Sequence, residues 1–337
     1  MQPKAISVDN ESASVEHLLM KTVPKLEMIA RRLNLSQSTI SRALNDYSDI
    51  SKQTKKLVSN VANEMGYQPN IYARRLASGK SETVAYLMPA YESENGNSFV
   101  GELISGMSSV LSESGWDLTV LSPATTEDEI TLFHKIARNR HISGLVISRT
   151  LVNDPRFEIL RNLQIPFITH GRSHSSEETA WIDVDNEKAF FEVTNHLFDL
   201  GHRKIAHIGG PLRFNFSMQR AEGWQSAMLK LKLPNPDGYH QISDLSFKGG
   251  KEAMHALLAL ENPPTAVCCV SDVTAIGAMQ ALRENNIVPG EDVSIIGYDG
   301  LEIGKYVEPP LSTITQPRKM AGEKIAKRIM GLIETGN

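Results

Sequence analysis

Apolar side chains in the first fifth of the chain recur three or four positions apart, which predicts short amphipathic helices. The three stretches are KLEMIARRLN (25–34), SQSTISRALN (36–45) and SKQTKKLVSNVANEMG (51–66), the last of which carries Leu57, Val58, Val61, Ala62 and Met65. Ser36 and Ser51 stand where helix N-caps are expected, and Gly66 marks the end of the third helix. Two helices joined by a tight turn and closed by a third are typical of the helix-turn-helix arrangement, in which the second helix lies in the DNA major groove.

The second helix separates an apolar face from a polar one. The apolar face consists of Leu35, Ile40, Ala43 and Leu44. The opposite side carries hydroxyl, amide and guanidinium groups, which are the side chains that meet base edges and phosphates. A solvated helix face would show the same pattern, so this strip alone leaves both interpretations open. The candidate DNA contacts of this stretch are Ser36, Gln37, Ser38, Ser41, Arg42 and Asn45.

The residues after the third helix form a short linking segment. In YQPNIYARRLASGKSETVAYLMPA (67–90), Pro69 breaks the helix and Asn70 can start a new one. The stretch IYARRLA is too short to be a stable helix by itself. Gly79 ends it before the apolar strand VAYLMP.

The rest of the chain alternates apolar runs with helical segments, a pattern that predicts parallel sheets with helices on both faces. The apolar runs are VAYLMP, DLTVLS, GLVIS, PFITHG, KIAHIGG, TAVCCVSD and DVSIIGYDG. Helical segments between them include FVGELISGMSSVLSESG, AFFEVTNHLFDLGH and TAIGAMQALRENN. The expected fold is therefore a small all-α head followed by an α/β body.

Charge divides the chain in the same way. Residues 25–80 carry ten Lys and Arg against four Asp and Glu, a net of +6, whereas residues 81–337 carry −9 and residues 1–24 carry −1. A basic segment on an acidic body is typical of a nucleic-acid-binding head. Residues 1–24 are polar and lack the apolar middle of a secretory signal, so we expect a flexible leader on a cytoplasmic protein. Cys268 and Cys269 are adjacent, which favours buried strand thiols over a disulfide framework, and vicinal redox chemistry is the alternative.

Head, linker and body together resemble the lactose-repressor (LacI/GalR) family of transcription regulators. LSQSTISRALN resembles the family's recognition helix, GYQPNIYARRLASGKS its hinge, and WIDVDNEKAFFEVTNHLFDLGHRKIAHIGGP and SDVTAIGAMQALRENNIVPGEDVSIIGYDG its body. The resemblance implies two discontinuous α/β lobes like those of periplasmic sugar-binding proteins, with a ligand cleft between them. It also implies that Asn70 and Leu76 contact DNA, Leu76 as an apolar wedge in the minor groove. The expected organisation is a leader (1–24), a helix-turn-helix domain (25–67), a hinge (68–80) and an effector-binding and dimerisation body (81–337).

Polar residues that follow the predicted strands are candidates for the cleft, because ligands of open α/β sheets bind at the carboxyl ends of strands. Arg220 and Asp272 match family positions that bind effector, and each can engage two neighbouring hydroxyls of a sugar. Asp272 could instead cap a helix. The aromatic candidates could stack on a sugar or fill the lobes' cores. The effector candidates are Phe99, Arg149, His170, Arg172, Phe216, Arg220, Phe247 and Asp272.

Enzyme and metal motifs fail on inspection. GKS at 79–81 lacks the upstream glycine of a phosphate loop, and IGGP (208–211) lacks dinucleotide-binding spacing. His196, His202 and His207 have no carboxylate or cysteine to complete a zinc site. No cofactor, metal or membrane partner is expected. We expect a homodimeric repressor that binds operator DNA and a small sugar or sugar derivative. The alternatives are a sugar-transport binding component, disfavoured by the basic head, and an α/β enzyme with an accessory DNA-binding head.

Overall fold

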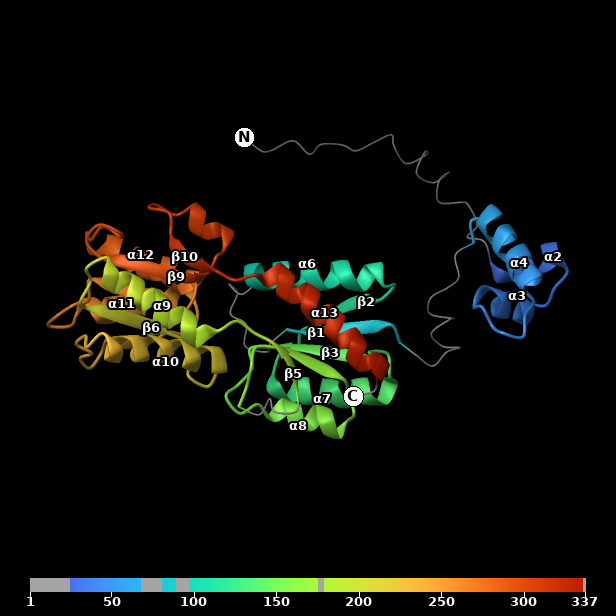
Figure 1. The fold of residues 1–337 in the computed structure, drawn as a ribbon, viewed down its shortest axis with the longest axis horizontal. Coiled ribbons are helices and arrows are strands. Elements are labelled where there is room, and N and C mark those ends of the chain that lie inside the picture. The colour runs from blue at the N-terminus through green and yellow to red at the C-terminus, as the bar shows by residue number, and fades with distance from the viewer. Residues whose placement is uncertain (1–24, 68–80, 89–96, 175–178, 336–337) are drawn as a thin grey trace, which may run out of the picture. The chain divides into compact units, whose positions relative to one another are not determined.

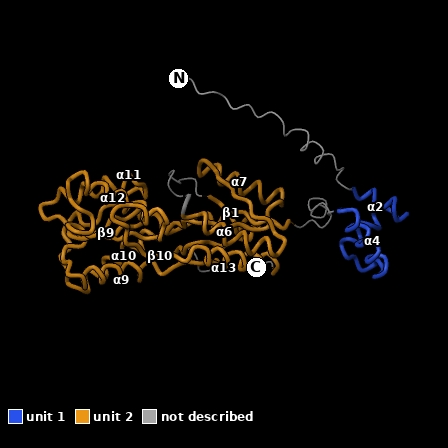
Figure 2. The backbone as a smooth tube through the Cα atoms, turned by 90° about the horizontal axis from the view of Figure 1, so that it is seen from above, with its two compact units in different colours: residues 1–80 blue, residues 81–337 orange. Residues whose placement is uncertain are grey.

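A computed structural model describes residues 25–67, 81–88, 97–174 and 179–335 of the chain. Two compact units divide at residue 80, and Figure 2 colours them separately. The segments predicted as a leader (1–24) and a hinge (68–80), with Asn70 and Leu76, lie outside the described residues.

The first unit contains the three helices that the apolar spacing predicted. They are α2 (Leu26–Leu33), α3 (Gln37–Leu44) and α4 (Lys52–Glu64). Ser36 and Ser51 cap α3 and α4, and each side-chain oxygen accepts a hydrogen bond at 3.1 Å from the backbone N–H three residues later. The buried core is Ile29, Ala30, Ile40, Ala43, Val58, Val61 and Ala62. Leu57 is an exception to the apolar stripe of α4, because half of its surface is exposed.

The second unit contains two five-stranded parallel sheets (Figure 1). The first has the order β2-β1-β3-β4-β5 and the second the order β10-β9-β8-β6-β7. Their strands are β1 (Thr83–Leu87), β2 (Asp117–Leu121), β3 (Gly144–Ser148), β4 (Phe167–His170), β5 (Ala180–Ile182), β6 (Ile205–Gly209), β7 (His240–Ile242), β8 (Ala266–Cys269), β9 (Ser294–Asp299) and β10 (Ser312–Thr315). In each sheet the second strand along the chain pairs on one side of the first strand, and the remaining strands are added on the other side. This reversal of strand order creates a switch point of the kind where α/β proteins bind ligands.

Helices cover both faces of each sheet. Against the first sheet pack α6 (Asn97–Glu113) and α13 (Arg318–Thr335) on one face, and α7 (Thr126–Asn139) and α8 (Pro155–Asn162) on the other. Against the second pack α9 (Asn186–Asp199), α10 (Asn215–Lys230), α11 (Phe247–Leu258) and α12 (Asp272–Glu284). Figure 2 shows α11 and α12 on one side of β9, and α9 and α10 on the other.

The two sheets define two lobes, and the chain passes between them twice within the described residues. It leaves the first lobe after β5 and enters α9 of the second, then returns from β10 to α13 of the first (Figure 1). Close packing of α13 on α6 requires two glycines. A Cβ atom on Gly106 would collide with the carbonyl oxygen of Lys319, and one on Gly322 with that of Leu103. The first lobe is therefore assembled from two segments far apart in sequence, whereas the elements of the second lobe, from α9 to β10, follow one another along the chain, so only the first of the two expected discontinuous lobes is discontinuous.

Candidate functional site

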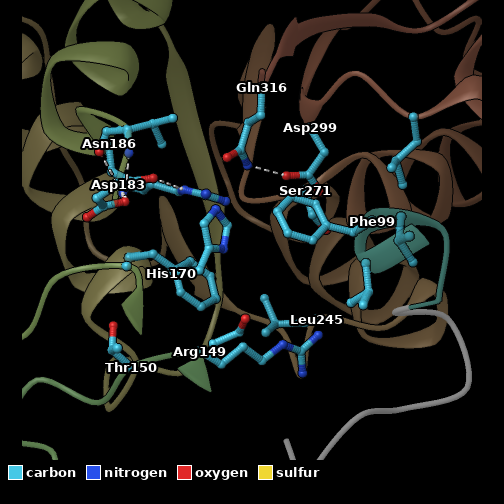
Figure 3. Close-up of a pocket in the computed structure, with 18 of the residues that line it drawn as sticks. Phe99, Arg149, Thr150, His170, Asp183, Asn186, Leu245, Ser271, Asp299 and Gln316 are labelled. Atoms are coloured by element: carbon cyan, nitrogen blue, oxygen red, sulfur yellow. Dashed lines mark hydrogen bonds between the residues drawn. The ribbon is translucent and has the colours of Figure 1, made fainter. Parts of the chain in front are cut away.

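A pocket lies where strands of both sheets end (Figure 3). Ser148 and His170 close β3 and β4 of the first lobe, and Asp299 closes β9 of the second. Ser271 follows β8 and caps α12. The pocket contains about 910 Å³ of space, part of it open to solvent, which is large enough for a mono- or disaccharide.

Arg220 is the most constrained cation in the pocket. Its side chain is 5% exposed, and it donates from Nε to Asn186 Oδ1 at 2.9 Å and from Nη1 to the carbonyl of Val270 at 2.6 Å. The guanidinium also lies over three aromatic rings, with Cζ 4.0 Å from the centroid of Tyr298, 4.9 Å from that of Phe216 and 5.9 Å from that of Phe190. These contacts fix the plane of the guanidinium before any ligand arrives.

Asp299 faces the same space from the end of β9. Gln316 donates to its Oδ1 at 2.7 Å, as the dashed line in Figure 3 shows. Burial raises the pKa of this carboxyl to about 7, although the positive charge of Arg220 opposes the shift. Such a carboxyl is partly protonated near neutral pH, so it can both donate to and accept from a ligand hydroxyl.

An apolar wall completes the pocket. The rings of Phe99 and His170 lie 5.8 Å apart at 41°, and Phe216 and Leu245 contribute from the second lobe. Burial lowers the pKa of His170, so its imidazole is neutral at physiological pH. An apolar wall opposite fixed polar groups suits a pyranose ring, which has apolar C–H faces and a polar edge.

The loop after β3 joins the two lobes at the edge of the pocket. Arg156 donates from Nη2 to the carbonyl of Arg149 at 3.2 Å and to Asp154 at 2.7 Å, which holds the loop in place. Val152 N then donates to the carbonyl of Arg213 at 2.9 Å, across the cleft. A second backbone hydrogen bond, from Asn215 N to the carbonyl of Thr150 at 3.0 Å, also joins the two lobes on this side.

Five of the eight effector candidates predicted from the sequence line the pocket, namely Phe99, Arg149, His170, Phe216 and Arg220. Arg172, Phe247 and Asp272 do not. Arg172 turns toward Asp183, to which its Nε donates at 3.1 Å, and toward the ring of Trp181. Phe247 occupies the first turn of α11, and the backbone carbonyl oxygen of Phe247 lies against Gly277 of α12. Neither side chain belongs to the pocket wall.

Asp272 is buried behind the pocket. It accepts hydrogen bonds from Leu301 N at 2.6 Å and from Thr313 Oγ1 at 2.5 Å, and its side chain is fully enclosed. The alternative that Asp272 caps α12 is wrong, because Ser271 is the N-cap and accepts from Thr274 N. Asp272 therefore supports Leu301, which does line the pocket.

Several pocket residues were not predicted. They include Tyr86, Ser148, Thr150, Asp183, Asn186, Leu245, Ser271, Asp299 and Gln316. Asp299 follows the apolar run SIIGY, so the rule that selected Arg149 and His170 applies to it equally. Gln316 follows a four-residue strand that has little sequence signal, and only the second chain crossing brings it to the pocket.

The candidate DNA contacts of the head fall into two groups. Ser36, Gln37, Ser38 and Arg42 are exposed, whereas Ser41 and Asn45 are half-buried. Asn45 Nδ2 donates to the carbonyl of Ser41 at 2.9 Å, so part of its polar capacity is used within α3. Arg42 pairs with Asp49 at 2.5 Å and lies over the ring of Tyr47. The exposed polar residues thus occupy the start and outer side of α3.

Two of the histidines singled out in the sequence form hydrogen bonds within the second lobe, and its two cysteines are buried. His202 hydrogen-bonds to Thr265 and Ser294, and His207 to the carbonyl of Cys268 at 2.9 Å. Burial raises the pKa of Cys268 to about 12, which keeps its thiol protonated. Within the ranges given above, no helix has the length and apolar character needed to cross a membrane.

Comparison with known proteins matches both units. Residues 25–70 match the model for bacterial regulatory proteins of the lacI family, and residues 194–337 match the periplasmic binding protein-like domain. The chain is 35% identical to the HTH-type transcriptional regulator AglR of Rhizobium meliloti, over 91% of this chain and 87% of that protein.

Solved structures agree in fold. A transcriptional regulator CelR–cellobiose complex superposes with a TM-score of 0.71 at 26% identity, covering 93% of this chain and 94% of the other. The lac repressor dimer bound to operator and the anti-inducer ONPF superposes with a TM-score of 0.80 at 24% identity, with 94% of each chain covered. The latter likeness establishes the α/β two-lobed architecture and the helical head.

Proposed function

The chain belongs to the LacI family of bacterial regulatory proteins, and from this premise we propose that it is a transcriptional repressor whose operator affinity is set by a small sugar-like effector. The effector site is the pocket between the two lobes, with Arg220 and Asp299 as its polar groups and Phe99 and Phe216 as its apolar faces. The pocket carries the proposal, because it joins fixed hydrogen-bonding groups of the second lobe to aromatic rings from both lobes. The CelR relative, whose structure holds cellobiose, supports a carbohydrate as the ligand class.

The head supplies the DNA contacts in this proposal. Gln37, Ser38 and Arg42 are exposed on α3 and can reach base edges or adjacent phosphates. Two heads are needed for a pseudo-palindromic operator, so we propose a homodimer. The proposed organisation is the one given by the sequence, with a domain at 25–67, a hinge at 68–80 and a body at 81–337. A regulator of chromosomal genes acts in the cytoplasm.

Control of the operator follows from differential binding. An effector that binds one arrangement of the lobes more tightly than another shifts the population toward that arrangement. The sign of the response, induction or co-repression, depends on which arrangement the effector prefers.

A thermal-shift screen tests the proposal first. Glucose, galactose, maltose, cellobiose, sucrose and raffinose are added one at a time, since a ligand at 100 times its dissociation constant stabilises a protein by about 2.7 kcal/mol. The sugar that stabilises most is then added to a DNA-binding assay with the chain's own upstream region. A sugar that stabilises the protein and changes its affinity for this DNA supports the proposal. Stabilisation without any effect on DNA binding contradicts it, and turnover of the sugar favours an enzyme.

A further inference from the structure

Arg318 occupies the second crossing between the lobes. It is the first residue of α13 and is 3% exposed. On the side of the second lobe it donates from Nη1 to the carbonyl of Asp299 at 2.9 Å and from Nη2 to that of Gly300 at 3.3 Å. On the side of the first lobe, Nη2 donates to Glu102 Oε1 of α6 at 2.6 Å. One guanidinium therefore holds groups of both lobes.

Both ends of this connection reach the effector pocket. Asp299 lines the pocket, and its backbone carbonyl is the atom that Arg318 holds. Phe99 also lines the pocket and lies three residues before Glu102 on α6, so the two share a helix face. The Cζ atom of Arg318 is 5.7 Å from the centroid of the Phe99 ring. A ligand that displaces either pocket wall must therefore disturb the Arg318 guanidinium.

One of the hydrogen-bond donors of Arg318 lacks a partner among the described residues, so a small movement of the lobes can change the energy of this arrangement. Its Nε atom is buried and has no hydrogen-bond partner among the described residues. A buried donor without a partner costs free energy. A second arrangement of the lobes that gave Nε a partner would offset part of that cost. A small ligand-dependent movement of the guanidinium can therefore favour one of two arrangements of the lobes.

We propose that Arg318 and Glu102 form a positioning pair that couples occupancy of the pocket to the arrangement of the two lobes, and through it to operator affinity. The inference rests on the proposed function and adds residues that need no contact with the effector. Arg318 acts through Asp299 and Phe99, and Glu102 acts through Arg318. Arginine is required at this position because one side chain must donate hydrogen bonds both to carbonyls of one lobe and to a carboxylate of the other, which the planar guanidinium with its several donors can do.

Glu102→Gln is the decisive variant. The Glu102 side chain is 54% exposed, so its ion pair adds little to stability and the variant should fold as the wild type does. Glu113→Gln is the matched control, because Glu113 is exposed near the other end of the same helix. Both variants make the same chemical change on α6, but only Glu102 contacts Arg318.

The first measurement uses the most stabilising sugar of the thermal-shift panel. We expect Glu102→Gln to reduce at least threefold the ratio between operator affinities with and without that sugar. The sugar's dissociation constant in the absence of DNA should change less than threefold. Glu113→Gln should keep the wild-type ratio. A wild-type ratio in Glu102→Gln overturns the positioning pair.

The second measurement needs no ligand and therefore separates this inference from the proposed function. Hydrogen exchange is followed in full-length protein for the backbone amides of residues 300–304, which belong to the second lobe. We expect Glu102→Gln, a change in the first lobe, to speed their exchange at least threefold, and Glu113→Gln to leave it unchanged. Unchanged exchange in Glu102→Gln overturns the coupling, whatever sugar or DNA the protein binds. If no sugar alters wild-type operator affinity, only the proposed function fails.

Arg318→Lys provides a check on mechanism. Lysine keeps the positive charge but cannot serve both lobes with a planar fork. In this background Glu102→Gln should cause no further change in exchange of residues 300–304. A full additional effect would show that Glu102 acts independently of Arg318 and would contradict the pair.

Discussion

The guanidinium of Arg220 lies over the ring of Tyr298, with Cζ 4.0 Å from the ring centroid. The described residues accept hydrogen bonds from Nε and Nη1 of Arg220, which leaves Nη2 for a ligand. Tyr298 precedes Asp299 on β9, so the stacking also fixes Arg220 relative to the pocket carboxyl. The cation and the carboxyl are therefore presented to a ligand as one preorganised unit.

Arg220→Lys should weaken sugar binding by about 1 to 3 kcal/mol, roughly fivefold to 150-fold, because lysine loses both the stacked plane and the fork of donors. Calorimetric titration with the most stabilising panel sugar measures the change. Arg203→Lys is the matched control, since Arg203 also stacks on an aromatic ring, that of Phe198, but is exposed on the surface. Equal affinities for wild type and Arg220→Lys would exclude a ligand contact at this position.

Asp299 should make stability depend on pH in the direction opposite to an ion-paired carboxylate. Its folded pKa of about 7 lies above the ordinary value of 3.8, so the native state retains a proton that the unfolded state has lost. The contribution of protonated Asp299 to the free energy of unfolding is fully present below about pH 4 and is lost as the pH rises through 7. Arg220 and Arg318 face the carboxyl as cations, and Asp272 as a second acid.

Asp299→Asn removes this titration. Relative to wild type, the variant should gain stability between pH 4 and 8, by an amount on the order of 4 kcal/mol if the neutral amide is accommodated equally well. Denaturant unfolding at several pH values gives the difference, and exposed Asp237→Asn serves as the control. A difference that does not vary with pH would show that Asp299 ionises normally in the folded protein.

The sequence predicted the elements whose signals are local. Ser36 caps α3 because a serine before an apolar-periodic stretch can accept from the third N–H of the helix, and this needs no tertiary contact. Strands such as β3 and β8 are continuous apolar runs and were predicted at nearly their observed bounds. The strands β5 (AWI), β7 (HQI) and β10 (STIT) are short, and none of them contains a run of four apolar residues such as AVCC of β8, so neither alternation nor an apolar run identifies them.

The pocket was only partly predictable, because position after a strand does not fix the direction of a side chain. Arg149 and His170 turn into the pocket, whereas Arg172, two residues after His170, turns to Asp183. Asp272 follows β8 as expected, but its carboxylate points to Leu301 N. Such choices depend on hydrogen-bond partners from distant segments, which one sequence does not place.

Arg42→Ala in the head should weaken specific operator binding by about 1 to 3 kcal/mol and leave the fold intact, because Arg42 is exposed on α3 and its pair with Asp49 is a surface pair. Affinity is compared on operator and random DNA. Arg31→Ala on α2 removes the same charge and the same kind of exposed ion pair, here with Glu27. If Arg42→Ala lowers both affinities equally, as loss of a phosphate contact would, base recognition by Arg42 is excluded.

Asp272→Ala should destabilise the protein by about 1 to 3 kcal/mol, since it leaves the Leu301 N–H and the Thr313 hydroxyl buried without their acceptor. Thr313→Val removes one of the two hydrogen bonds and should cost less. Sugar binding should weaken in Asp272→Ala because Leu301 lines the pocket, but saturating sugar should still change operator affinity as in wild type. Chemical denaturation and operator binding at saturating sugar measure the two effects. Wild-type stability combined with complete loss of sugar binding would instead place the Asp272 carboxylate in direct contact with the effector.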